Sequence, residues 1–152
     1  MSTKPMCLPN KPTLRSIGTQ GTTSIPYPIF DWAYVPVNPH NTPTGRYLYA
    51  LGHTPIGITQ PLGGTALLRF NRDTGVWTTV KQYGAVGVLG ITAHTWGAVF
   101  ASSSGSLYAT DSITGQMWKF PLATLGNPTL ITAYPPQAII DGARCFNAPD
   151  PS

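Results

Sequence analysis

The chain has 152 residues, of which 41% are hydrophobic and only 9% are charged, and it contains 16 glycines and 16 prolines but no glutamate. A normal hydrophobic fraction argues against disorder, and prolines at this density interrupt long helices, so the composition predicts an all-β domain with many turns. The net charge of +4 comes from scattered lysines and arginines, and no window of about 18 apolar residues occurs, so we expect neither a nucleic-acid partner nor a membrane span.

In chain order, residues 1–12 form a proline-rich, irregular arm, residues 13–146 the folded domain and residues 147–152 a flexible tail. Within the domain, short runs of β-branched and aromatic residues alternate with segments rich in glycine, proline and asparagine. In one run, period-two alternation places Phe30, Trp32 and Tyr34 on one face. We therefore predict short strands over residues 13–19, 30–35, 46–51, 65–71, 76–82, 96–101, 107–110, 117–120, 129–134 and 138–145.

One strand–turn–strand phrase occurs twice, over residues 67–77 and again over residues 104–120. The Thr74-Gly75 and Thr114-Gly115 pairs lie 40 positions apart, and each provides a glycine that can adopt a positive φ in a turn. A repeat near 40 residues with four strands is typical of a β-propeller blade. The sequence thus predicts a propeller-like domain of three to four small blades, with a β-trefoil as the alternative. Because incomplete rings leave apolar faces, copies of the chain are expected to complete the architecture by self-association.

The two cysteines, Cys7 and Cys145, lie almost at the ends of the chain. A disulfide between them would close a loop of roughly 140 residues and stabilise the fold by roughly 4–5 kcal/mol in the chain-entropy model. The alternative is two free thiols, and the sequence leaves both open. Low charge and a surface rich in Ser, Thr, Pro and Gly are typical of an extracellular or cell-surface protein, and this composition, with the terminal placement of the cysteines, favours the bridge.

Several phrases resemble the propeller-like modules of secreted fungal and bacterial surface proteins, which form a domain family of unknown function. They lie at residues 31–34, 47–52, 67–75 and 105–118, and Asp141-Gly-Ala-Arg-Cys145 is similar to the segment that ends such modules. The resemblance covers about residues 28–146. It implies the fold and an extracellular setting, and it carries over no catalytic residues.

Candidate chemistry is sparse. The three histidines, His40, His53 and His94, have no metal-ligand spacing, and the aspartates sit in turns without the dense pattern of a calcium loop, so we expect no metal or other cofactor. No Gly-x-Ser-x-Gly phrase is present, so we expect no enzyme. The aromatic residues are the remaining lead: most should pack inside, while a few at a rim would stack on sugar rings beside Asp or Arg. The candidate ligand-binding residues are Trp96, His94, Asp141 and Arg144.

Three functions follow from these features. The first is a non-enzymatic recognition module, secreted or surface-displayed, whose partners would be glycans or another surface protein. The second is a self-assembling homo-oligomeric subunit of an extracellular or coat-like assembly. The third, a propeller-type hydrolase, rests on fold analogy alone.

Overall fold

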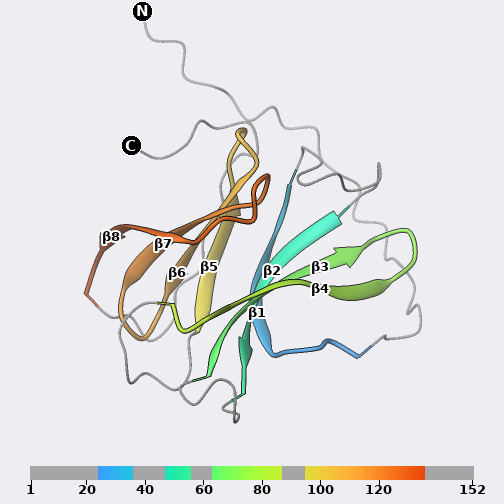
Figure 1. The fold of residues 1–152 in the computed structure, drawn as a ribbon, viewed down its shortest axis with the longest axis horizontal. Coiled ribbons are helices and arrows are strands. Elements are labelled where there is room, and N and C mark those ends of the chain that lie inside the picture. Colours follow the sequence, from blue (N-terminus) through green and yellow to red (C-terminus); the bar gives the residue numbers. More distant parts are fainter. Residues whose placement is uncertain (1–23, 36–46, 56–62, 87–94, 136–152) are drawn as a thin grey trace, which may run out of the picture.

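The computed structural model of the chain describes residues 24–35, 47–55, 63–86 and 95–135. In these ranges all regular structure is β, which confirms the all-β prediction (Figure 1). Two sheets of four antiparallel strands are present, and each is a meander in which consecutive strands are neighbours. The first contains β1 (Ile29–Tyr34), β2 (Tyr47–Thr54), β3 (Gly64–Asn71) and β4 (Val76–Gly84), and the second β5 (Trp96–Ala101), β6 (Ser106–Asp111), β7 (Gln116–Pro121) and β8 (Thr129–Ala133).

Several predictions from the sequence fall outside the described residues. These are the arm at residues 1–12, the strands at residues 13–19 and 138–145, the tail, and both cysteines of the expected bridge, Cys7 and Cys145. The remaining predicted strands all correspond to strands of the two sheets.

The repeated phrase does form two hairpins with the same turn. In each, the fifth residue, Gly75 or Gly115, donates its backbone N–H to the carbonyl of the first, Asn71 or Asp111, at 2.8 Å. Gly75 has φ 71° and Gly115 has φ 69°, the left-handed region in which a glycine has no steric cost. The first residue of each turn also accepts hydrogen bonds from the next residues with its side chain.

The 40-residue spacing of these turns nevertheless differs from the spacing between equivalent strands of the two sheets. The first hairpin joins β3 to β4 at the outer edge of its sheet, whereas the second joins β6 to β7 at the centre of the other. Strands in equivalent places, β2 and β6, begin at Tyr47 and Ser106, which are further apart than 40 residues. The recurrence reflects local turn chemistry, which any antiparallel pair can use.

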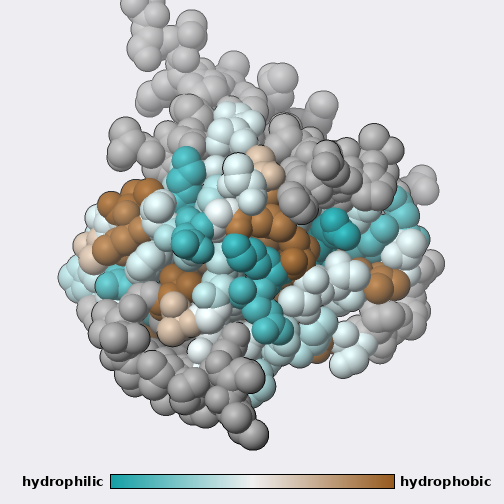
Figure 2. Space-filling model, in the orientation of Figure 1, coloured by the Kyte–Doolittle hydropathy of each residue, from teal (hydrophilic) through white to brown (hydrophobic). Residues whose placement is uncertain are grey.

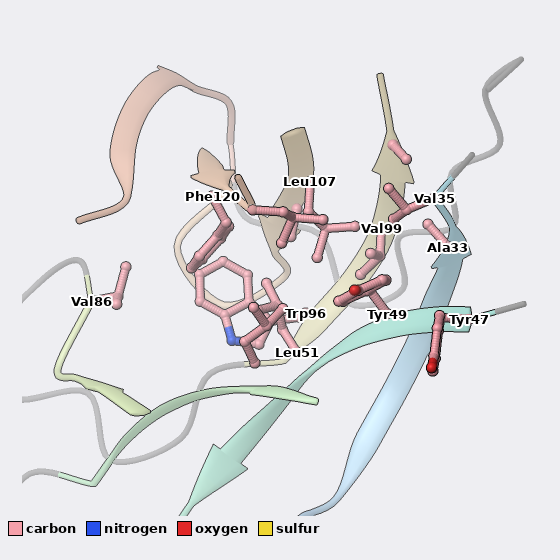
Figure 3. Close-up of a cluster of buried hydrophobic side chains, with 14 residues drawn as sticks. Ala33, Val35, Tyr47, Tyr49, Leu51, Val86, Trp96, Val99, Leu107 and Phe120 are labelled. Carbon is pink, nitrogen blue, oxygen red and sulfur yellow. The ribbon is translucent and has the colours of Figure 1, made fainter. Parts of the chain in front are cut away.

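The hydrophobic core lies between the two sheets (Figure 3). Its largest buried side chains come from opposite sheets, with Leu51 and Leu67 on the first and Trp96 and Phe120 on the second. Trp96 meets Phe120 edge to face at 5.5 Å between ring centroids, and Tyr83 of β4 meets the same ring at 5.4 Å. Aromatic edges against ring faces are a favoured packing geometry. The core therefore ties the two sheets into one packed unit.

The first strands of the sheets, β1 and β5, lie against each other without joining into one sheet. A β-bulge between Ile29 and Trp32 redirects Asp31, whose Oδ2 accepts a hydrogen bond from the backbone N–H of Val99 in β5 at 2.7 Å. The side chain thus takes the place of a partner strand at that edge. The other outer strands, β4, β5 and β8, also carry bulges, while the β2–β3 and β6–β7 pairs run without one. Bulges at edges limit unwanted strand pairing.

Candidate functional site

Trp96 is the one described member of the predicted ligand-binding group, and it lies in the core. Only 1% of it is exposed, and its indole packs on Phe120 between the sheets. In this position the ring fills space and presents no face to solvent. His94, Asp141 and Arg144 lie outside the described residues.

The serines in the turn between β5 and β6 bind one another and stabilise the turn. The hydroxyls of Ser102, Ser104 and Ser106 are joined by hydrogen bonds of 2.9 and 3.2 Å, and Ser102 and Ser106 are buried. Gly105 closes the turn by donating its N–H to the Ser102 carbonyl. Within the described ranges, no three His, Cys, Asp or Glu side chains lie close enough to hold a metal ion.

A group of large aromatic side chains is instead exposed on β1. The exposed fraction is 54% for Trp32 and 42% for Tyr34. The register pairs Trp32 with Ala50 and Tyr34 with Leu48, so both side chains project from the same face of the first sheet. Phe30 is exposed as well, but the bulge interrupts the alternation that had placed it with the other two.

This face is the one turned away from the core. Tyr47, Tyr49 and Leu51 of β2 point into the core, so the alternate positions, Leu48 and Ala50, point outward. In register with Tyr34 and Leu48 lie Phe70 on β3 and Trp77 on β4, whose rings are 5.1 Å apart. We refer to Trp32, Tyr34, Phe70 and Trp77 together as the aromatic face.

The segment before β1 covers the other end of the same side of the sheet. Tyr27 of this segment packs against Ala50, Ala66 and Leu68, together with Ile29 at the start of β1 and Trp77 of the aromatic face. The close approach requires a glycine beneath it, because a Cβ on Gly52 would lie 2.9 Å from the Cβ of Tyr27. The Tyr27 hydroxyl also accepts a hydrogen bond from Gln82 of β4 at 2.7 Å. The aromatic face is therefore bounded on one side by a packed segment.

On the other side it is bounded by the β3–β4 turn. Arg72 and Asp73 in this turn are exposed and follow directly after Phe70 and Asn71. Asn71 fixes the turn, since its Oδ1 accepts hydrogen bonds from the backbone N–H groups of Asp73 and Thr74 at 2.8 and 3.2 Å. A rigid turn with a guanidinium and a carboxylate beside aromatic rings offers hydrogen-bonding groups next to a stacking surface.

Other cations of the first sheet are directed to its core side. The Arg69 guanidinium lies 4.8 Å from the centre of the Tyr47 ring. Lys81 Nζ donates to the carbonyl of Leu125 and lies 4.9 Å from the centre of the Tyr83 ring. These contacts hold both positive charges away from the aromatic face.

The hydroxyl of Tyr83 is a buried polar group that lies apart from the aromatic face. Burial raises the pKa of its phenol from 10.0 to about 12. Its hydroxyl is buried, and among the described residues it has no hydrogen-bond partner. A buried hydroxyl in this state destabilises the folded protein.

Tyr83→Phe is therefore expected to leave stability at pH 7 unchanged or slightly raised. Because the folded-state pKa lies above the unfolded value, the wild type keeps its full stability below about pH 10 and loses part of it as the pH rises towards about 12. Tyr83→Phe should remove that part of the alkaline loss. Urea unfolding from pH 8 to 11.5 measures it, and equal alkaline slopes for the two proteins would contradict the burial of this phenol.

The chain matches no protein-family model, no curated protein and no solved structure. In the part of the chain that the structure describes, no helix has the length and apolarity needed to cross a membrane.

Proposed function

We propose that this protein is a non-enzymatic recognition module that binds carbohydrate through the aromatic face of its first sheet. The supporting observation is the exposure of Trp32 and Tyr34 on one face of β1, with Tyr34 in register with the rings of Phe70 on β3 and Trp77 on β4. Exposed rings stack on the C–H faces of sugars, while nearby polar groups take the hydroxyls. Arg72 and Asp73 supply such groups at the adjoining turn.

The proposal includes a propeller-like scaffold, in which the two sheets are neighbouring blades. Two features support it: each sheet is a four-stranded meander, and the first strands of the two, β1 and β5, lie closest to each other. The low charge of the sequence supports an extracellular or cell-surface location.

Glycan binding by the wild type and by Trp32→Ala tests the proposal. Because Trp32 is mostly exposed, its removal should leave the unfolding free energy within about 0.5 kcal/mol of wild type. Affinity for the bound glycan should fall by roughly tenfold or more, since a stacked ring contributes on the order of 1.4 kcal/mol.

Tyr134→Ala is the matched control, because Tyr134 is also an exposed aromatic residue but follows β8 on the other sheet. It should bind as the wild type does. Equal losses for the two variants, or no binding to a broad glycan panel, would contradict the proposed site.

Self-association is a second candidate, and the outer edge of the second sheet favours it. β8 exposes Leu130 and Ile131 and contains no charged residue. Figure 2 shows hydrophobic surface, in brown, gathered where β8 lies in Figure 1. An uncharged apolar surface at the edge of a sheet can pack against another copy. Light scattering should then give a discrete oligomer that Ile131→Lys dissociates, and a strictly monomeric wild type would exclude this candidate.

A further inference from the structure

We infer that the aromatic face binds a neutral, linear, β-linked polysaccharide whose chain lies across the strands of the first sheet. This inference rests on the proposed function and names the class of its ligand. Three observations carry it: the direction of the ring row, its length, and the distribution of charge around it.

The direction of the row comes from the strand register. Tyr34 pairs with Leu48, Leu48 with Phe70, and Phe70 with Trp77, so the row runs from β1 to β4 at right angles to the strands. Neighbouring strands lie about 4.8 Å apart, so three such steps span about 14 Å. This length exceeds one sugar ring and suits several consecutive rings of an extended chain.

The straight line of the rings on the sheet favours one type of glycosidic linkage in the ligand. The row stands on a β-sheet with the Tyr27 segment on one side and the β3–β4 turn on the other, so contacts follow one line. A β-linked chain is extended and ribbon-like, and its rings can meet Tyr34, Phe70 and Trp77 along such a line, with Leu48 between the first two. An α-linked chain that coils would place only one or two rings against the row.

The charge on the face selects a neutral ligand. Three register rows span all four strands on this side of the sheet, ending on β4 at Trp77, Thr79 and Gln82, and none of their positions carries a charged residue. The nearby cations Arg69 and Lys81 make their contacts on the core side. At the turn, Arg72 and Asp73 are of opposite sign and give no net charge. An anionic polysaccharide would find no concentrated positive charge here.

Calorimetric titration with β-1,4-linked gluco-oligosaccharides of one to six units tests the inference, with α-1,4-linked oligosaccharides and polygalacturonate as comparison ligands. Affinity for the β-linked series should rise at least about tenfold between two and four units and then level off, as each further ring gains a stacking partner. The α-linked and anionic ligands should bind more weakly than the β-linked tetramer.

Variants at the two ends of the row add a second readout. Tyr34→Ala and Trp77→Leu should each reduce the gain from two to four units while changing the affinity for the disaccharide less, and circular dichroism checks that both fold. Wild-type affinity that is independent of chain length, or preference for the anionic or α-linked ligand, would overturn this inference. If such binding still depended on Trp32, the proposed function would stand; no binding to any glycan would overturn both.

Discussion

Replacing Gly115 by alanine is expected to lower the free energy of unfolding by at least about 3 kcal/mol. Gly115 has φ 69°, where an L-residue with a Cβ is disfavoured by roughly 1–2 kcal/mol. A Cβ at this position would also lie 2.7 Å from the carbonyl carbon of Tyr134 and closer still to its oxygen. The backbone around Tyr134 must therefore move, which strains the hydrogen bond from its N–H to the Gly115 carbonyl.

Gly84→Ala separates the two causes. Gly84 has φ 71°, almost the same conformation, but no atom of the described residues lies within 4 Å of the position that a Cβ would take. This control should cost only the conformational part, roughly 1–2 kcal/mol. Urea unfolding of both variants gives the comparison, and hydrogen exchange should show loss of protection in β8 for Gly115→Ala alone. Equal unfolding free energies for the two variants would mean that the contact with Tyr134 contributes nothing.

Local features of the fold could be predicted from the sequence because they depend on neighbouring residues. The Thr-Gly turns and the alternation in the strands specify hairpins within a few residues of chain, and the structure contains them. The arrangement of those hairpins in sheets depends on pairing between distant segments. For this reason the 40-residue recurrence correctly predicted the two turns, but the spacing between equivalent strands of the two sheets is longer than 40 residues.

For the same reason, the sequence could not show which aromatic residues are buried in the core and which are exposed. Trp32 and Trp96 both lie in first strands next to small residues, and nothing local distinguishes them. Packing of the two sheets buries Trp96 against Phe120 and leaves Trp32 on the opposite face of its own sheet. The bulge in β1 then takes Phe30 out of the alternation of Trp32 and Tyr34, because an extra residue of this kind shifts the register of the side chains before it.

Removal of the buried carboxylate of Asp111 is expected to cost roughly 2–4 kcal/mol, because it leaves several donors without their acceptor. Asp111 is 1% exposed. Its Oδ1 accepts hydrogen bonds of 3.2 Å from the backbone N–H groups of Thr95 and Ile113, and its Oδ2 accepts one of 2.8 Å from the Thr114 hydroxyl. The side chain thus holds both the β6–β7 turn and the residue that precedes β5.

Asn71→Ala is the matched control, since Asn71 occupies the same position in the β3–β4 turn. Its side chain accepts from two backbone N–H groups of its own turn, at an exposed site where water can replace it, so the expected cost is about 1 kcal/mol or less. The difference between Asp111→Ala and Asn71→Ala in urea unfolding measures what burial and the bond to Thr95 add. If the two variants lost equal free energy of unfolding, the hydrogen bond between Asp111 and Thr95 would contribute nothing. The second sheet would then be stabilised by its backbone hydrogen bonds and its hydrophobic core alone. A larger loss for Asp111→Ala would show that the first position of the same turn contributes more stability in the second sheet, because the Asp111 side chain is enclosed by the fold.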